Sequence, residues 1–462
     1  MARMLPTVCS SLLGRNFRAL STSVTAKKKS VRIGGASGFW GDTAVAAPQL
    51  LKGGNIDYLV FDYLAETTMA ILAKMHEKKP ELGYATDFVA VTMKHIAKQC
   101  KASGVKVIAN AGGVNPLACK AALEAVLDAQ GVDLKVGVVL GDDLLPRAEE
   151  LRALASDVDL FDGTGSFPSK PLSINAYLGA RPIAELLTQG CDVVITGRVV
   201  DSAVTLGACM HEFGWDDLEY DALSGATLAG HIIECGAQAS GGLFTDWEAH
   251  ADGWSNIGYP VAEVEPCGSF TVSKPAGTGG VVSVGTISEQ LLYEIGDPGA
   301  YHVPDVACDW TAVELEQTAV DEVRVSNVRG RPPTSSYKTT TTYFDGFRNE
   351  ALLVIAGIDA DKKAHATANA LITRQRAMLK AMAMPDYTEV NVEVIGAEHI
   401  YGANRAVVAP REVVLKMCAM TMWRRPLERA GSSAAEAVSD AAAMAAAIAA
   451  AEAARCCLSA PL

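Results

Sequence analysis

Five short apolar runs in the first half of the chain each lead into a loop of glycine or polar residues and then into a helical pattern. They lie within residues 31–42, 57–64, 105–116, 134–145 and 190–207. Short β-branched runs of this kind suit strands that are buried on both faces. Strands that alternate with helices at this spacing form a parallel sheet covered by helices. The sequence therefore predicts an α/β fold, with a parallel, Rossmann-like, helix-covered sheet in residues 29–258.

The pattern changes after about residue 260. The segments VAEVEP, GSFTVSK, GGVVSVGTIS, VELEQTAVDEVRVSNV and SYKTTTTYFDGF alternate apolar and polar residues, which predicts antiparallel strands with one solvated face. A helix is expected at 361–384 and a further strand at 388–395. A chain of 462 residues exceeds what one compact core usually holds. We therefore expect a largely antiparallel α+β second domain over residues 259–420.

Both ends of the chain differ from these two domains. Residues 1–28 carry arginines and lysines, and no acidic residue precedes Asp42, which is typical of a mitochondrial transit peptide. We expect import into the mitochondrial matrix; a basic leader without an address is the alternative. At the other end, 11 of the 14 residues in 441–454 are alanine. Residues 421–462 are expected to be a weakly ordered tail or an incorrectly assembled gene end.

Composition argues against several classes of function. The formal net charge is −13, from 40 basic and 53 acidic residues, which disfavours a nucleic-acid surface. No uncharged apolar run approaches about 18 residues, so no membrane span is expected. The 11 cysteines include no CxxC pair and match no zinc spacing. We expect no metal, and no motif requires a cofactor.

Acidic and basic residues follow the predicted parallel strands, where the ligand sites of such sheets lie. Asp62, Glu66, Asp142 and Asp201 are therefore candidate acid–base residues. Arg198 is a candidate for binding a carboxylate or phosphate, because its planar donor fork grips such groups through two bonds. The alternative is a local ion pair between Arg198 and Asp201 in the first helical turn.

Two of the loops are rich in small residues that allow a backbone to approach an anion. Neither loop is a GxGxxG or P-loop motif, so the signal is weak, and a tight turn packed under Phe39 and Trp40 is the alternative for the first. The candidate anion-binding residues are Gly34, Gly35, Ser37 and Gly38 in the first loop, and Asn110, Gly112, Gly113 and Asn115 in the second.

Two further segments offer polar groups. His231, Glu234 and Cys235 share one face of a predicted helix. That face can supply a base, a nucleophile or part of a metal site, or it can be a packed face with satisfied polar groups; His231 and Cys235 are kept as catalytic candidates. The long segment 161–190 either forms a lid over the site, with Asn175, Tyr177 and Arg181 reaching in, or is a surface loop.

The chain resembles the acyclic terpene utilisation AtuA family. The motifs that carry the resemblance are IGGASGFWGD, NAGGVNP, TGRVVDSAVTLG, GHIIECGAQASGG, GTGGVVSVGTISEQLLYEIGDPGAYHVPDV and VRGRPPTSSYK. The similarity runs from about residue 31 to about residue 420, after which the sequence departs into WRRPLERAGSS and polyalanine. The resemblance implies a place near the enzymes of branched acyl-CoA breakdown, such as geranyl-CoA and methylcrotonyl-CoA carboxylation. It transfers no catalytic residue.

Residues and resemblance together lead to one expected function. It is an enzyme of the mitochondrial matrix that acts on a branched or terpenoid acyl-CoA or carboxylic acid by proton transfer, as a hydratase, lyase or hydrolase. One alternative is a non-catalytic binding or assembly subunit for an acyl-CoA carboxylase pathway. A second is a nucleotide-dependent oxidoreductase, which the imperfect glycine pattern disfavours. The expected partners are a small-molecule acyl-CoA or carboxylate and further copies of the chain in a homo-oligomer.

Overall fold

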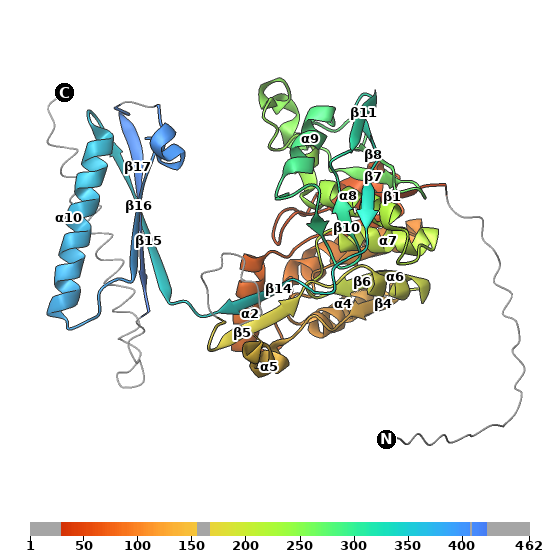
Figure 1. Ribbon diagram of the computed structural model, residues 1–462, viewed down its shortest axis with the longest axis horizontal. Coiled ribbons are helices and arrows are strands. Elements are labelled where there is room, and N and C mark those ends of the chain that lie inside the picture. Colours follow the sequence, from red (N-terminus) through yellow and green to blue (C-terminus); the bar gives the residue numbers. More distant parts are fainter. Residues whose placement is uncertain (1–28, 155–166, 407–408, 423–462) are drawn as a thin grey trace, which may run out of the picture. The chain divides into compact units, whose positions relative to one another are not determined.

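The computed structural model describes residues 29–154, 167–406 and 409–422 (Figure 1). The chain divides into two compact units, Met1–Tyr343 and Phe344–Leu462. The expected transit peptide and most of the expected C-terminal tail lie outside the described residues. Both of those expectations therefore stay predictions.

A nine-stranded sheet forms the centre of the first unit, with the order β11-β12-β8-β7-β1-β2-β3-β6-β4. Its parallel half consists of β1, β2, β3, β6 and β4, and these are the five predicted strands. Their side chains are almost entirely buried, as expected for strands covered on both faces. The bounds are β1 (Val31–Gly35), β2 (Tyr58–Phe61), β3 (Lys106–Ala109), β4 (Val136–Val139) and β6 (Val193–Thr196).

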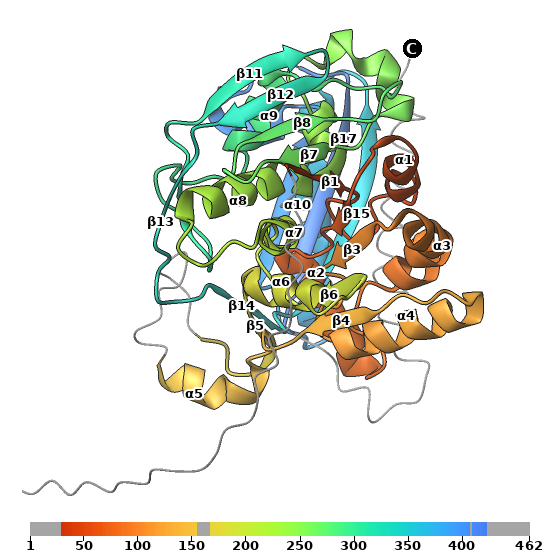
Figure 2. The same ribbon diagram turned by 90° about the vertical axis from the view of Figure 1, so that its right-hand side faces the viewer.

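Helices cover both faces of this parallel half. On one face lie α1 (Ala46–Gly53), α3 (Lys94–Ser103) and α4 (Pro116–Gln130). On the other lie α6 (Arg181–Thr188), α7 (Ala203–Phe213) and α8 (Tyr220–Glu234), as Figure 2 shows. The predicted α/β class, with a helix-covered parallel sheet, is confirmed.

The antiparallel half continues the same sheet from β1. It contains β7 (Val261–Val264), β8 (Phe270–Ser273), β11 (Glu314–Ala319) and β12 (Glu322–Ser326). The domain boundary expected near residue 259 therefore falls inside the first unit. The physical reason is that β7 pairs with the open edge of β1, from Val31↔Val264 to Gly34↔Val261. The change from parallel to antiparallel pairing occurs within one sheet, and the units divide only after Tyr343.

One predicted strand is a helix. The segment GGVVSVGTIS leads into α9 (Val284–Leu292), which begins with a capping box. The Ser283 side chain accepts a hydrogen bond from the Thr286 backbone N–H, and the Thr286 hydroxyl accepts one from the Ser283 backbone N–H. These reciprocal bonds satisfy donors that a helix start leaves free. They outweigh the strand preference of the two valines before Ser283.

Smaller elements complete the first unit. The predicted loop 161–190 contains β5 (Pro171–Ala176), which pairs antiparallel with β14 (Thr339–Tyr343). The helix α2 (Glu66–Lys78) contacts both of these strands. A short sheet has the order β13-β10-β9. The remaining bounds are β9 (Tyr301–His302), β10 (Ala307–Asp309), β13 (Arg329–Arg331), α5 (Ala148–Ala153), and the short helices η1 (Phe88–Met93) and η4 (Gly236–Ser240).

The second unit is an antiparallel sheet with one helix. The strand order is β15-β17-β16, with β15 (Phe347–Ala356), β16 (Glu389–Ile395) and β17 (Glu412–Thr421). The helix α10 (Ala360–Ala381) packs its alanines at 360, 364 and 368 against Leu353, Ile355 and Leu415. The helix predicted at 361–384 and the strand predicted at 388–395 are both present. Within the described residues of the whole chain, no helix is long and apolar enough to cross a bilayer.

Candidate functional site

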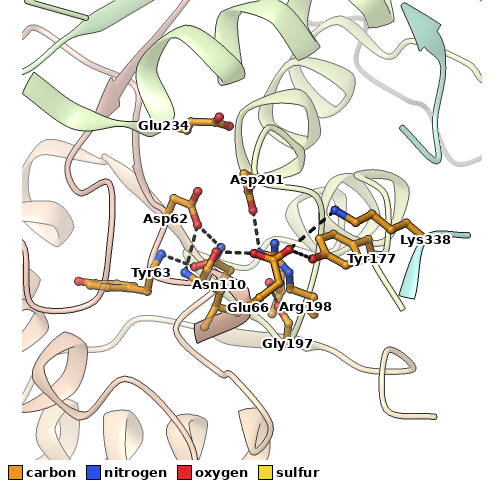
Figure 3. A network of polar contacts seen from close by, with 12 residues as sticks. Asp62, Tyr63, Glu66, Asn110, Tyr177, Gly197, Arg198, Asp201, Glu234 and Lys338 are labelled. Carbon is orange, nitrogen blue, oxygen red and sulfur yellow. Dashed lines mark hydrogen bonds and ion pairs between the residues drawn. The ribbon is translucent and has the colours of Figure 1, made fainter. Parts of the chain in front are cut away.

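The register of the parallel strands brings the candidate residues to one edge of the sheet. Phe61 in β2 pairs with Ala109 in β3, so the residues that follow them, Asp62 and Asn110, lie side by side. Asn110 Nδ2 donates to Asp62 Oδ1 at 2.5 Å, and Asn110 Oδ1 accepts from the Tyr63 backbone N–H at 2.7 Å (Figure 3). Asn110 is fully buried, so it fixes the Asp62 carboxyl rather than meeting a ligand.

The loop after β6 is held by Asp142, which follows β4. Asp142 Oδ2 accepts from the Arg198 backbone N–H at 2.8 Å and from Asn175 Nδ2 at 2.9 Å. A Cβ at Gly197 would lie 2.5 Å from the Asp142 carboxylate, so only glycine fits there. Burial raises the pKa of Asp142. Its contacts give Asp142 the role of holding the backbone that carries Arg198.

The Arg198 guanidinium lies in the protein interior and is 2% exposed. Its Nη1 donates to Leu64 O at 2.9 Å and to Asp201 Oδ1 at 2.7 Å. The guanidinium carbon lies 4.2 Å from the centre of the Tyr177 ring, a cation–π contact. The local ion pair considered as an alternative is therefore present. Binding of an external anion by Arg198 stays a prediction, and Nε is left without a partner among the described residues.

Three carboxylates gather beside Arg198. Asp62, Asp201 and Glu234 each place an oxygen within 4.8 Å of the other two (Figure 3). We call these residues the carboxylate cluster. The exposure of the side chains differs: Asp62 is 7% exposed, Glu234 9% and Asp201 35%. Solvent therefore reaches the cluster first at Asp201.

The cluster retains protons more strongly than ordinary carboxyl groups. Burial, then the charges of Asp201 and Glu234, hold the pKa of Asp62 well above its usual value, although Arg198 lowers it. Burial followed by the charge of Asp201 acts in the same direction on the pKa of Glu234. Burial also raises the pKa of Asp201, against the effect of Arg198. Burial and repulsion between close carboxylates therefore favour the protonated forms of these three groups.

His231 connects the cluster to the helix α9. Its Nδ1 lies 3.0 Å from Glu234 Oε1, and its Nε2 lies 3.0 Å from Gln290 O. Because a carbonyl oxygen only accepts, Nε2 carries a proton and donates it. Burial lowers the pKa of His231 and raises that of Glu234, which favours a neutral ring whose Nδ1 accepts a hydrogen bond from the Glu234 carboxyl. The nearby Cys235 has its pKa raised to about 12 by burial foremost, which disfavours a thiolate nucleophile.

Glu66, Tyr177 and Lys338 form a second group of polar side chains beside Arg198. The Tyr177 hydroxyl donates to Glu66 Oε1, and Lys338 Nζ lies 3.8 Å from the same oxygen. Burial raises the pKa of Glu66, but the hydrogen bond from Tyr177 and the nearby cations lower it overall. Lys338 Nζ also lies 4.7 Å from the Tyr177 ring centre. With its side chain 63% exposed, Lys338 is a cation that an anionic substrate can reach.

The glycines of the two predicted anion loops lie against the protein itself. A Cβ on Gly35 would lie 2.4 Å from Ile233 O, and one on Gly38 would lie 3.0 Å from the Cys235 backbone. Gly34 faces Leu50 and Gly112 faces Thr196 O, while Gly113 has a φ of +54° and abuts Gly83 O. These glycines permit close packing of α8 and neighbouring loops, which accounts for them without a bound anion.

Two polar residues of those loops also have structural roles. Asn115 caps α4: its Oδ1 accepts from the Ala118 N–H at 3.3 Å, and its Nδ2 donates to Pro80 O and Leu82 O. Ser37 is buried and donates to Asp62 O at 3.1 Å. Asn115 therefore does not join the carboxylate cluster, whereas Ser37 supports its backbone.

The site as a whole combines residues that lie far apart in the sequence. Asp62, Arg198, Asp201 and His231 come together as predicted, and Asn175 and Tyr177 reach the site from β5 and the residue after it. Arg181 does not reach it, because it pairs with Asp217. Lys338 lies in a turn-rich segment, and its position in the sequence favours a surface residue over a site residue. Asp142 and Glu66 lie next to the cluster rather than in it.

The carboxylate cluster is also the set of residues that could hold a metal ion. Oxygen ligands of this type suit hard divalent cations such as Mg²⁺ or Mn²⁺. We expected no metal because the sequence contains no metal-binding motif. A motif could not have revealed this cluster, because its three carboxylates come from two separate loops and a helix. Arg198 already supplies positive charge to the cluster, which reduces the electrostatic need for an ion.

Comparison with known proteins identifies the family. The model of the acyclic terpene utilisation family protein AtuA matches residues 31–457. The match extends beyond residue 420, where the similarity was expected to end. No match was found among curated proteins or among solved structures. The chain belongs to the acyclic terpene utilisation family AtuA.

Proposed function

We propose that the protein is an acid–base enzyme that acts on a branched or terpenoid carboxylic acid or its acyl-CoA thioester. Family membership points to terpene utilisation. The observation that carries the reaction type is the carboxylate cluster, whose three oxygens lie within 4.8 Å of one another beside one buried guanidinium. Carboxyl groups with raised pKa values can exchange protons nearer to neutral pH than ordinary carboxyl groups, which favours general acid–base catalysis.

The positions of the three carboxyls suggest different roles. Asp201 is the most exposed and is the group that meets substrate. Asp62 and Glu234 lie deeper, and their raised pKa values make them proton donors to Asp201 or to the substrate. A hydratase, lyase or hydrolase reaction each needs one group that accepts a proton and one that donates a proton. The cluster places candidates for both roles within 4.8 Å of each other.

The charges near Tyr177 fit an anionic substrate. Lys338 is exposed beside the Tyr177 ring, and the buried Arg198 contacts the same ring. A carboxylate or a phosphate of coenzyme A can pair with Lys338 while the acyl group reaches Asp201. Further parts of the proposal rest on sequence alone: residues 1–28 support import into the mitochondrial matrix, and a homo-oligomer is the expected assembly.

Hydrogen–deuterium exchange into the substrate tests the reaction type without knowledge of the product. The protein is incubated in D₂O with a panel of branched acids and acyl-CoA thioesters, and mass spectrometry measures deuterium in the recovered compounds and in any new product. We expect exchange or turnover with at least one compound. Asp201→Asn should abolish it, and the exposed, distant Asp133→Asn should not.

Two results would count against the proposal. One is a compound that binds but shows neither exchange nor product, which would favour the non-catalytic binding subunit. The other is unchanged exchange in Asp201→Asn, which would place the chemistry away from the carboxylate cluster. Loss of activity after metal chelation, with recovery on adding Mg²⁺ or Mn²⁺, would instead assign the cluster to a metal.

A further inference from the structure

The sheet of the second unit has one covered face and one open face. The helix α10 packs along the covered face, where it meets Leu353 and Leu415 (Figure 1). Successive side chains of a strand point to opposite faces, so Leu352, Val354 and Val414 lie on the other face. We call this other face the open face. A free face of an antiparallel sheet usually carries polar residues, so apolar side chains gathered there mark a binding surface.

The register of the strands gathers the apolar side chains at one end of the open face. Val354, Val414 and Ile395 form a row across all three strands, because Val414 pairs with both of the others. We call these three residues the apolar row, and Leu352 adjoins it in β15. Leu352 is 65% exposed, Val354 67% and Ile395 45%. Large aliphatic side chains thus lie together at the surface of the second unit.

The opposite end of the open face is charged. Arg348 lies there, six positions before Val354 in β15. At about 3.4 Å per residue, six positions span about 20 Å. Between the two ends, Lys416 Nζ lies 3.8 Å from a Glu350 oxygen and 3.2 Å from a Glu393 oxygen. The open face therefore changes from charged to apolar along the direction of its strands.

The chain leaves the sheet at the charged end of the open face. The strand β17 runs from the apolar end towards the charged end, where Thr421 is its last residue. Residues 423–462 follow, and they lie outside the described part of the chain. A segment tethered this close to a surface has a high effective concentration there, so it competes well with separate molecules. This segment is therefore the first candidate for the occupant of the open face.

The sequence of that segment favours a helix with one short apolar stripe. Alanine fills 11 of the 14 positions in 441–454, and alanine has the highest helix propensity. Ser433 is a suitable N-cap residue before this run, and Arg455 suits the last turn. The bulky apolar residues of the run are Met444 and Ile448, whose spacing of four places them on one side of a helix. Such a helix gains most of its stability from a surface on which it packs.

The stripe matches the open face in order and in spacing. Glu436 precedes Ile448 by 12 residues, which is about 18 Å along a helix and close to the length from the charged end to the apolar row. Met444 lies about 12 Å along the same helix. Leu352 lies four positions, or about 14 Å, from Arg348. A helix that runs back along β17 therefore brings its acidic residue to the charged end and its bulky apolar residues to the apolar end.

The covered face of the same sheet shows that alanine suits this kind of packing. The helix α10 places Ala360, Ala364 and Ala368 against that face, at the spacing of four that also separates Met444 from Ile448. The match to the family model continues to residue 457, so it includes the alanine-rich segment together with the sheet. A second alanine-rich helix on the open face would complete a sheet that is covered on both sides.

We propose that residues 434–455 form a helix that packs on the open face of their own chain, with Met444 and Ile448 against its apolar end. The occupant is thus the C-terminal segment of this chain and not a second molecule. The docked helix covers the apolar row, and Glu436 approaches Arg348 near the start of the helix. The contact lies in the second unit, so the proposal goes beyond the proposed acid–base reaction and does not depend on it.

Disulfide crosslinking of the full chain tests this contact, because a disulfide forms only between Cβ atoms about 3.5–4.5 Å apart. The variant carries Val354→Cys and Ile448→Cys, with Cys456→Ser and Cys457→Ser to remove the native thiols of the segment. After mild oxidation, peptide mass spectrometry should find the 354–448 disulfide in most molecules. The matched control carries Ala446→Cys instead of Ile448→Cys. Residue 446 lies about 200° around a helix from residue 448, so its yield should be at least about tenfold lower.

A denaturing gel without reductant separates crosslinks within one chain from crosslinks between two chains. The 354–448 disulfide at the monomer mass, with little crosslinking from residue 446, supports the proposal. The same disulfide found only at the dimer mass would place the segment on a second copy and overturn the proposal. Equal yields for Ile448→Cys and Ala446→Cys would show contact without the expected helix face, and no disulfide with either would show no contact. Both of these results would also overturn it.

Limited proteolysis tests the same contact without introduced cysteines, and so decides the matter if those variants do not fold. Glutamyl endopeptidase cleaves after Glu436 and Glu452, and docking should protect both bonds in the wild type. Val354→Asp places a charge in the apolar row at an exposed position, so it should raise the cleavage rate at least about tenfold. Val320→Asp is the matched control, because Val320 is 92% exposed and belongs to the first unit. Its cleavage rate should equal that of the wild type, and an equal rate in Val354→Asp would refute the docking.

Discussion

Replacing Arg198 by methionine tests whether its guanidinium is the charge that holds the site together. Methionine keeps an unbranched side chain of similar length but removes three contacts. These are the pair with Asp201 Oδ1 at 2.7 Å, the hydrogen bond to Leu64 O at 2.9 Å and the stacking on Tyr177 at 4.2 Å. The stability of the protein should therefore fall.

The magnitude follows from burial. Removing one partner of a buried ion pair costs about 3–5 kcal/mol, because the other charge stays uncompensated. Here the Asp201 side chain is 35% exposed and solvent screens part of its charge, so the lower end, about 3 kcal/mol, is expected. The Asp62 carboxyl is 7% exposed and its pKa is lowered by Arg198, so loss of the cation also makes ionised Asp62 more costly.

Guanidinium denaturation of the wild type, Arg198→Met, Asp201→Asn and the double variant measures this coupling. We expect the loss of unfolding free energy in the double variant to be about 1–3 kcal/mol smaller than the sum of the losses in the two single variants. Arg147→Met is the matched control, because Arg147 forms a fully exposed pair with Glu150 and should show no measurable change. A loss below about 1 kcal/mol in Arg198→Met, or additive single changes, would refute the view that Arg198 stabilises the carboxylate cluster.

Further predictions concern pH, packing and location. Glu234→Gln should stabilise the protein at pH 8 but not at pH 4. The pKa of Glu234 is raised in the folded state, so the folded protein keeps a proton that the unfolded chain releases. The stability of the wild type therefore falls as the pH rises from the pKa of the unfolded chain to that of the folded protein. Melting curves across this range check the sign, and a variant less stable at pH 8 would contradict it. Gly197→Ala should lower the free energy of unfolding by at least about 1–3 kcal/mol, because the new Cβ would lie 2.5 Å from the Asp142 carboxylate. Gly190→Ala is the control: its Cβ would meet open space, so only the backbone strain of a φ of +83° should destabilise it. A fluorescent fusion should move from mitochondria to cytosol when residues 1–25 are deleted; a full-length fusion found in the cytosol would refute the transit peptide.

Most of the parallel half of the fold could be predicted from the sequence. The runs around Leu59, Ile108 and Val194 are short, apolar and β-branched, and each ends at a polar residue or a glycine. Such local patterns reflect burial on two faces, which does not depend on knowing the neighbouring strand. The antiparallel strands β7, β8, β11 and β12 were also recognised, but not that β7 continues the same sheet. A strand's sequence shows how it is buried and not which edge it joins.

The candidate site was predictable only in part. Carboxyl ends of parallel strands share one edge, so the sequence alone determined that Asp62, Asn110, Asp142 and Arg198 lie in the same region. It did not determine which of them touch. The register places Asn110 on Asp62, and the length of the loop after β4 places Asp142 on the Arg198 backbone instead of in the cluster. Such contacts depend on shifts of a single residue between strands that lie far apart in the chain.

The remaining features were decided by tertiary structure. The end of α8 packs against the loop after β1, and this brings Glu234 to Asp62 and His231 to Gln290. That approach is possible because Gly35 and Gly38 have no side chain, and glycines that looked suited to an anion therefore serve packing. The sequence by itself determined where strands, helices and polar loops occur, because those depend on local pattern. Only the folded structure decided that three carboxyls lie close together, because the chain brings them from positions more than 170 residues apart, from Asp62 to Glu234. Their pKa values depend on this proximity.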